Sequence, residues 1–277
     1  MVECIGTSAA VSLWQIENLP RLKTQQLAKY RGFVMGNDAV IVAHELLSQG
    51  ISASCCLLNP TSADVLAVRN YLGADRVRVV DESVGARTQS LCFEDTTGAR
   101  YWLFSRTHSP SGSLGQLTAD IVYMDFYPEL FDFFDQARNS AELARCTTIV
   151  NLSLVRDPTQ IPELSFRPSV IQASVLEEVN PSDSLNFARR LLDKSEADMA
   201  FVTLGARGAT VACRSEGWHV PAQSVLQRTI LGAGAVFSSS VAVGMVQGYS
   251  CRELLEFSVV RTAKRLQLWR EHEDFRT

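Results

Sequence analysis

The residues with the clearest chemical potential lie near the C-terminal end of the chain, in the sequence Gly232-Ala233-Gly234-Ala235. Glycines let the backbone turn sharply here, so that several N–H groups can lie close together. The small and apolar residues from Ala235 to Met245 predict a buried helix that begins at this turn. The first N–H groups of a helix lack partners within it, and with the helix dipole they favour an anion such as phosphate. We therefore interpret Gly232, Ala233 and Gly234 as an anion hole.

Glycine turns before helices also occur in other settings. The dinucleotide-binding fold needs a βαβ unit and the rest of its sheet after the glycines, whereas only enough chain for two helices follows Gly234. The other setting is a turn before a buried helix with no bound ligand. The motif by itself does not exclude that alternative.

The composition is that of a globular protein without a polyanionic or membrane partner. The chain has 277 residues, of which 46% are hydrophobic and 20% are charged, and its net charge is -4. This length suits one large α/β domain with a small appendage. The mildly acidic charge and the lack of a Lys/Arg cluster argue against a nucleic-acid partner. No apolar run approaches the ~20 residues that span a bilayer, so we expect no membrane partner.

Cysteine and histidine usage predicts a reduced, cytoplasmic protein without a zinc site. The seven cysteines include no C-x-x-C pair, which favours small buried thiols over a disulfide framework. The four histidines are far apart in the sequence and form no zinc pattern. Residues 1–6 lack the charged and apolar regions of a signal peptide, and we expect them to form a first strand instead.

Short apolar runs alternate with amphipathic stretches along the whole chain. We expect strands at 2–6, 9–13, 51–58, 76–80, 120–124, 147–152, 169–173, 199–204, 209–213 and 218–220. We expect helices at 39–47, 61–73, 129–145, 182–194, 235–245 and 250 to about 272. A hairpin signal joins 88–94 to 100–104 through a turn that ends at Gly98. This alternation predicts βαβ units, a parallel sheet covered on both faces, and a single domain over 1–277.

The glycine turn and a second motif together resemble the PfkB or ribokinase-like family of carbohydrate and nucleoside kinases. The family signature is Gly-Ala-Gly-Asp followed by an apolar helix. Just ahead of it lies a strand-turn-strand segment, Val-Thr-Leu-Gly-x-x-Gly, which residues 202–208 match closely. In the family this turn lies beside the nucleotide, so the resemblance implies that Thr203, Gly205 and Gly208 are nucleotide-binding residues.

The resemblance also implies a fold, cofactors and a substrate class. The fold is a ribokinase-like three-layer α/β/α sandwich with a mostly parallel central sheet and a small, reduced β lid, whose strands come from about 9–20 and 86–105. The implied cofactors are ATP and Mg²⁺, and the implied acceptor is a small sugar-like or nucleoside molecule. Gly36 and Asn37 stand where the family has a substrate-contacting Gly-Gly-Asn turn, so they are the implied substrate-binding residues.

Several positions depart from the family pattern. Ala235 replaces the aspartate that acts as the family's catalytic base. The stretch 8–11, equivalent to the place where the family's first strand usually delivers an Asp that hydrogen-bonds sugar hydroxyls, has no acid, and Val40 stands where a second asparagine is common. The family's Asn-x-x-Glu motif, linked to magnesium and phosphate, reads Ser174-Val-Leu-Glu177, so Glu177 is implied as an indirect magnesium residue. An engineered Asp→Ala change would explain position 235 alone, whereas natural divergence would explain all of these changes, and both explanations stay open.

These losses leave two functions from different classes. The first is a PfkB-type carbohydrate kinase, an ATP-dependent phosphotransferase with an alcohol acceptor. Its activity is expected to be slow or absent, because the Ala235 methyl group cannot accept a proton and a positioned base contributes roughly 10²–10⁴ in rate. The second is a catalytically inactive pseudokinase that binds a nucleotide or a partner. Different chemistry in the same cleft is a third alternative, and no nucleophile–base pair in the sequence supports it.

Charged and aromatic residues elsewhere give weaker signals. Asp125, near the end of a predicted strand, is interpreted either as a substitute acid in the cleft or as a surface or loop carboxylate. Arg87, Arg100 and Arg106 lie on or beside the hairpin and would either bind an anionic substrate or form a solvated edge. Tyr101 and its aromatic neighbours lie on the same hairpin. The family's lid often forms a dimer contact, which leads to the hypothesis of a homodimer through the lid hairpin.

Overall fold

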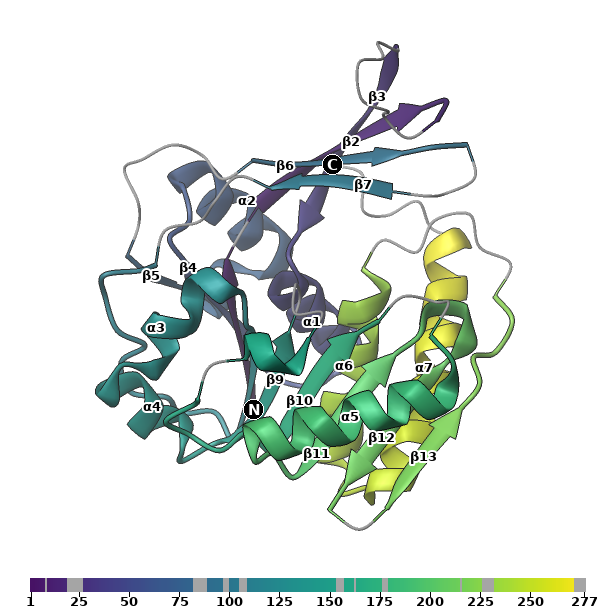
Figure 1. Ribbon diagram of the computed structural model, residues 1–277. Coiled ribbons are helices and arrows are strands. Elements are labelled where there is room, and N and C mark those ends of the chain that lie inside the picture. The colour runs from purple at the N-terminus through teal and green to yellow at the C-terminus, as the bar shows by residue number, and fades with distance from the viewer. Residues whose placement is uncertain are drawn as a thin grey trace.

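Two β-sheets organise the protein, whose structure is a computed structural model (Figure 1). Within the described residues, nine strands form the larger sheet and four form the smaller one. The structure describes residues 1–7, 9–18, 27–81, 89–96, 100–104, 109–152, 157–161, 163–175, 179–214, 216–225 and 232–271.

The larger sheet has the strand order β13-β12-β11-β10-β9-β8-β1-β4-β5. All neighbours from β11 to β5 are parallel, whereas β12 and β13 add to one edge in antiparallel fashion. The predicted mostly parallel sheet is thus confirmed. Its strands are β1 (Val2–Thr7), β4 (Ala53–Leu58), β5 (Val77–Val80), β8 (Ile121–Asp125), β9 (Thr147–Leu152), β10 (Val170–Ser174), β11 (Met199–Thr203), β12 (Ala209–Cys213) and β13 (Gly217–Val220).

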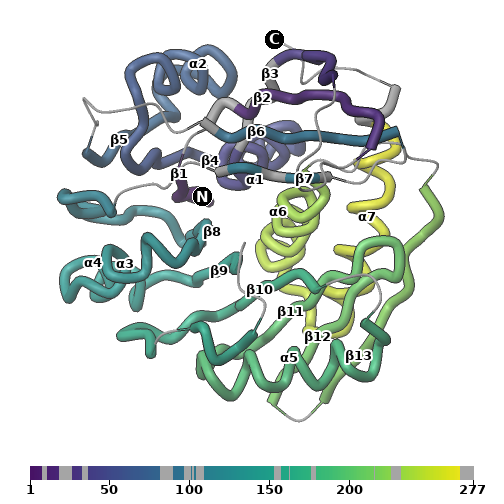
Figure 2. The backbone as a smooth tube through the Cα atoms, turned by 45° about the horizontal axis from the view of Figure 1, so that its top comes forward, coloured from purple at the N-terminus to yellow at the C-terminus, as the bar shows by residue number. Residues whose placement is uncertain are grey.

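Helices cover both faces of this sheet (Figure 2). Successive side chains of a strand point to opposite faces, and two buried apolar clusters result, with Cys4 in one and Ile5 in the other. The first cluster lies under α1 (Asp38–Leu47), α2 (Ser62–Leu72), α6 (Ala233–Val246) and α7 (Cys251–Glu271). The second lies under α3 (Phe131–Asp135), α4 (Ala137–Leu143) and α5 (Pro181–Ser195). None of the described helices has a stretch long and apolar enough to cross a membrane.

The single helix predicted over 129–145 is wrong, because the chain breaks into α3 and α4 at Gln136. The backbone of Gln136 is extended there, with φ -56° and ψ 132°. The side chain of Asn139 makes two hydrogen bonds at this break. Its amide N–H donates to the Phe133 carbonyl oxygen at 2.7 Å, and its side-chain oxygen accepts from the Leu114 N–H at 2.9 Å. These bonds give partners to the Phe133 carbonyl and the Leu114 N–H, and a continuous helix over 129–145 would place the Asn139 side chain elsewhere.

The smaller sheet has the order β3-β2-β6-β7 and lies beyond one end of the larger sheet, at the top of Figure 1. Its strands are β2 (Ala9–Ile16), β3 (Ala28–Gly36), β6 (Gln89–Glu94) and β7 (Arg100–Phe104). Strands β2, β6 and β7 fall in the ranges expected for a lid, and β3 is a strand that the sequence did not predict. The chain enters this sheet directly after β1 and leaves it from β3 into α1, so the lid sheet connects to both elements at the carboxyl end of β1.

Candidate active site

Helix α6 begins at the predicted anion turn. Its N-cap residue, Gly232, has a left-handed backbone with φ 80°, which glycine adopts without strain. The Val236 N–H donates to the Gly232 carbonyl oxygen at 3.0 Å, which closes the first turn. Gly232 carries no side chain to accept the earlier N–H groups of the helix. A Cβ atom added at Gly234 would meet no heavy atom of the described residues within 4 Å, so among them open space lies in front of this turn.

This open space belongs to a cavity of about 730 Å³ between α6, α7 and the turn after β11. The structure brings five of the sequence-predicted residues to its wall, namely Thr203, Gly205, Gly208, Ala233 and Gly234. The α7 side of the wall is mostly apolar and includes Val259, Ala263 and Leu266. Among the described lining residues none carries a charge.

The turn after β11 needs both of its glycines. Gly205 and Gly208 have φ values of 57° and 97°, which L side chains rarely adopt. The segment after β13 packs directly against this turn, because a Cβ at Gly208 would lie 2.6 Å from the Ala222 nitrogen and closer still to the Val220 carbonyl oxygen. Glycine at 208 therefore lets two segments of the cavity wall approach each other.

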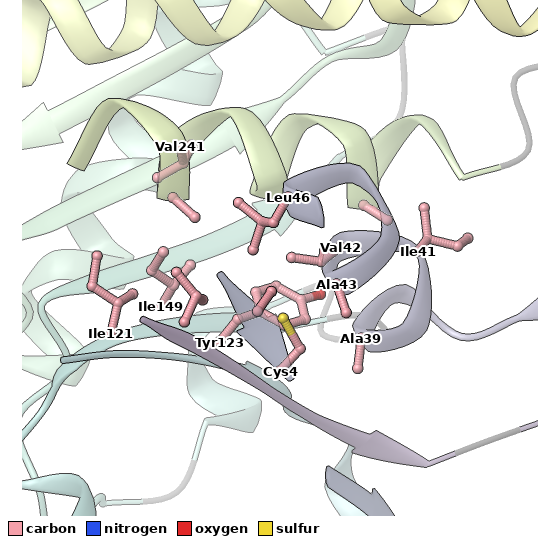
Figure 3. Close-up of a cluster of buried hydrophobic side chains, with 14 of the residues drawn as sticks. Cys4, Ala39, Ile41, Val42, Ala43, Leu46, Ile121, Tyr123, Ile149 and Val241 are labelled. Atoms are coloured by element: carbon pink, nitrogen blue, oxygen red, sulfur yellow. The ribbon is translucent and has the colours of Figure 1, made fainter. Parts of the chain in front are cut away.

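A row of polar side chains crosses the larger sheet near the carboxyl ends of its strands. Asp125 in β8 is paired in register with Asn151 in β9, which is paired with Gln172 in β10. All three are buried. They face the α1 and α6 side of the sheet, since Tyr123, two residues before Asp125, lies in the apolar cluster under those helices (Figure 3).

This polar row joins the first turns of α1 and α6. At one end, the Asn151 side-chain amide donates to Asp38 Oδ2 at 2.9 Å, and the Ala39 N–H donates to the Asp125 carboxylate at 3.0 Å. At the other end, the Gln172 amide donates to the Gly234 carbonyl oxygen at 3.5 Å and accepts from the Ser238 hydroxyl at 3.0 Å.

Burial perturbs the titration of the acids in this row. Loss of water raises the pKa of Asp125 well above its usual range, and the neighbouring charge of Asp38 raises it further. Burial also raises the pKa of Asp38, whereas the hydrogen bond from Asn151 lowers it. The Tyr123 hydroxyl donates to Asp125 at 2.7 Å, and burial followed by that carboxylate raises the pKa of the phenol. Perturbed carboxyl groups of this kind cluster at functional sites.

The comparisons with known proteins decide the fold. A scan against protein-family models finds no match, and a search of curated proteins finds none either. Solved structures do match. A nucleoside kinase from Burkholderia thailandensis in complex with inosine superposes with a TM-score of 0.71 at 17% identity, over 96% of this chain and 91% of that one. The chain has the ribokinase-like fold.

Two further structures of this fold match over nearly their whole length. The ribokinase from Cryptococcus neoformans var. grubii serotype A in complex with ADP has a TM-score of 0.70 at 14% identity, over 96% of this chain and 94% of that one. Phosphofructokinase-2 from Escherichia coli in complex with fructose-6-phosphate has a TM-score of 0.65 at 15% identity, over 97% and 99%. The similarity therefore covers the lid sheet and the larger sheet together.

The remaining predicted residues lie apart from the cavity wall or outside the described residues. Ala235 is fully buried in the apolar cluster under α6. Gly36 ends β3 and Asn37 is the N-cap of α1, where the Asn37 amide donates to the backbone and side-chain oxygens of Thr7. Glu177 lies outside the described residues.

Of the weaker candidates from the sequence, the structure describes the side chain of Asp125 but not those of the three hairpin arginines. Asp125 has no exposed surface, so its interpretation as a surface or loop carboxylate is wrong. It is seated beside Gly6, at which a Cβ would collide with the Asp125 carboxylate. Arg87 and Arg106 lie outside the described residues, as does the side chain of Arg100.

Sequence reasoning missed three polar residues that extend or belong to the polar row. Asp38 accepts a hydrogen bond from Asn151, Gln172 donates to the Gly234 carbonyl oxygen, and Ser238 donates to Gln172. A signal existed for Asp38, because it directly follows the Gly36-Asn37 turn at a predicted helix start, where an acid is favoured. Gln172 lies within an apolar strand, and a polar residue in such a run indicates a buried partner.

Proposed function

We propose that this chain is a PfkB-type small-molecule kinase by descent, which binds ATP in the cavity beside α6. The observation that carries the proposal is the opening of the α6 N-terminus onto that cavity. Phosphate groups would lie against the N–H groups of Ala233 and Gly234, which also line the cavity. The nucleotide base would lie against the apolar α7 wall, at Val259, Ala263 and Leu266.

Magnesium would enter with the nucleotide. Magnesium is usually held by one or two carboxylates together with the substrate's phosphates. Among the described residues no group of three or more histidine, cysteine, aspartate or glutamate side chains could hold a metal ion. We assign Glu177 as the chain's indirect contribution to magnesium, on the strength of its family motif alone.

The acceptor would be a small sugar-like or nucleoside molecule bound near Gly36 and Asn37, between the lid sheet and the polar row. The comparison structures are described with inosine and with fructose-6-phosphate, which sets the acceptor class for screening. Transfer by a base at position 235 would be lost, since Ala235 cannot accept a proton, and the rate would fall by roughly 10²–10⁴.

A second candidate function is nucleotide binding without transfer. The full burial of Ala235 favours it, because a methyl group packed in the core adds stability where a catalytic carboxylate would be costly to desolvate. Such a pseudokinase would keep the cavity and would bind ATP without producing ADP.

We also propose that two copies associate through the lid sheet. Tyr30, Tyr101 and Leu103 are exposed on β3 and β7, with 44–46% of their surface open to solvent. Apolar residues gathered on one sheet are typical of an interface between copies. Sedimentation at high protein concentration tests this proposal, and a strict monomer would remove it.

Calorimetric titration with ATP and magnesium tests nucleotide binding. We expect a dissociation constant in the micromolar range for the parent chain. An added Cβ at Gly234 would meet no heavy atom of the described residues within 4 Å, so Gly234→Val places its side chain in front of α6 and binding should weaken at least ~10-fold. Ala63→Val is the matched control, since Ala63 is exposed at the same position of α2.

The same titration separates the two candidate functions when ADP formation is measured afterwards. Fructose 6-phosphate, inosine and D-ribose serve as acceptors. ADP formation that depends on an acceptor supports the kinase, and binding without ADP formation supports the pseudokinase. Failure of the parent chain to bind ATP overturns both functions.

A further inference from the structure

The proposed transfer lacks a proton acceptor at position 235, yet a carboxylate from another element lies beside the same helix. Asp38 is the first residue of α1 and keeps part of its surface open to solvent. The structure holds its side chain through Asn151, on the strand next to the one that binds the first turn of α6. This acid has no counterpart among the family residues that the sequence resembles.

We propose that Asp38 is the catalytic base of this protein and accepts the proton of the acceptor hydroxyl. The inference rests on the proposed kinase function and adds the residue that carries its proton transfer.

Hydrogen bonds and strand pairing connect Asp38 to Gly234. Asn151 binds Asp38, Gln172 binds the Gly234 carbonyl oxygen, and these two amides occupy paired positions on adjacent parallel strands. Adjacent strands are about 4.8 Å apart. The Asp38 carboxylate is therefore linked, across one strand spacing and two hydrogen bonds, to the helix turn proposed to hold the phosphates. An acceptor hydroxyl has to lie between a base and that turn.

Asp38 is the member of the acid pair that can reach a substrate. Asp125 has no exposed surface and already accepts hydrogen bonds from Tyr123 and from the Ala39 N–H. Asp38 accepts a hydrogen bond from Asn151 on Oδ2, and part of its surface is open to solvent. Burial raises the pKa of Asp38, and a carboxylate whose pKa is raised is a stronger proton acceptor while it remains ionised.

The step balances without any further reactant. The hydroxyl oxygen forms a bond to the γ-phosphorus of ATP as its proton moves to Asp38. The bond between the γ-phosphorus and the β,γ-bridging oxygen breaks, and ADP leaves with the electron pair. Asp38 then releases its proton to water. Nothing is oxidised or reduced.

Asp38→Asn tests the inference, because it keeps the shape and the position of the side chain but removes the proton acceptor. We expect ADP formation, measured with the acceptors named above, to fall at least ~100-fold. The dissociation constant for ATP with magnesium should change less than ~3-fold, since Asp38 does not line the nucleotide cavity. Asp183→Asn is the matched control, because Asp183 is a first-turn acid of α5, and it should leave ADP formation unchanged.

A second variant separates a missing base from a damaged fold. Asp38→Glu keeps a carboxylate at this position and should form ADP at least ~10-fold faster than Asp38→Asn. If Asp38→Asn forms ADP within ~3-fold of the parent rate, Asp38 is not the base. If the parent binds ATP yet forms no ADP with any acceptor, the inference also fails, because a competent base implies turnover. Loss of ATP binding in the parent would instead overturn the proposed function itself.

Discussion

Replacing Gly208 with alanine tests whether the turn after β11 shapes the cavity. The backbone there has φ 97° and ψ -140°, a region that is essentially restricted to glycine and that costs a side chain about 1–3 kcal/mol. The added Cβ would also lie 2.6 Å from the Ala222 nitrogen and 2.8 Å from the Pro221 carbonyl carbon. Both contacts are with backbone, so the two segments have to separate, and overpacking of this kind costs about 1–3 kcal/mol more.

Gly248→Ala isolates the strain from the contact. Gly248 also has a positive φ, of 73°, but a Cβ there would meet no heavy atom within 4 Å in the part of the chain that the structure describes. We expect Gly248→Ala to lose about 1–2 kcal/mol of unfolding free energy from backbone strain alone. Gly208→Ala should lose about 2–6 kcal/mol.

Urea unfolding followed by calorimetric titration with ATP and magnesium measures both effects. Gly208→Ala should weaken ATP binding at least ~10-fold, because Gly208 and Ala222 both line the cavity and are pushed apart. Gly248→Ala should bind ATP like the parent. If the two variants are equally stable and bind ATP equally well, the close approach at Gly208 does not shape the nucleotide site.

Three other predictions concern buried charge and buried thiols. Arg265→Met should lower the unfolding free energy by about 3–5 kcal/mol in urea unfolding. The reason is that the fully buried Glu45 loses its bidentate ion pair with Arg265, which has N–O distances of 2.7 and 2.9 Å. Adding Glu45→Leu to this variant should regain most of the lost free energy. Burial raises the pKa of Asp125 well above 3.8, so the folded state holds this proton more strongly and the unfolding free energy falls as the pH rises above 3.8. That fall should be smaller in Asp125→Asn, measured between about pH 4 and about pH 7, and an equal fall in both proteins would contradict the assignment. Burial raises the pKa of the Cys56 thiol to about 12, so mass spectrometry should find it alkylated at about pH 8 only after unfolding.

Local sequence patterns were sufficient for most of the fold. The run at 147–152 is short and apolar, and it forms a buried strand; the amphipathic stretch at 182–194 forms a helix. The pattern failed where tertiary contacts overrode it. Strand β3 begins with polar residues such as Lys29 and Arg31, and its partner is the lid strand β2 and not the larger sheet. The break at Gln136 depends on contacts that no local pattern records.

In the candidate site, too, some features could be predicted from local sequence and others could not. Gly232-Ala233-Gly234 and the turn around Gly208 were recognisable because glycine at a turn before a helix or strand has a local, steric reason. The structure then placed both on one cavity wall. The fold of the solved kinases, at 14–17% identity, could be expected from these motifs, whereas the polar row could not.

The sequence by itself determined the glycine turn before α6, the mostly parallel sheet and the absence of an acid at position 235, because each depends on residues that are neighbours in the chain. Only the tertiary structure linked a carboxylate, that of Asp38, to that turn through Asn151 and Gln172. Asp38 and Asn151 are 113 residues apart, and Gln172 and Gly234 are 62 residues apart. Their hydrogen bonds exist because parallel strands bring their carboxyl ends to one edge of the sheet, where the helices that follow also begin.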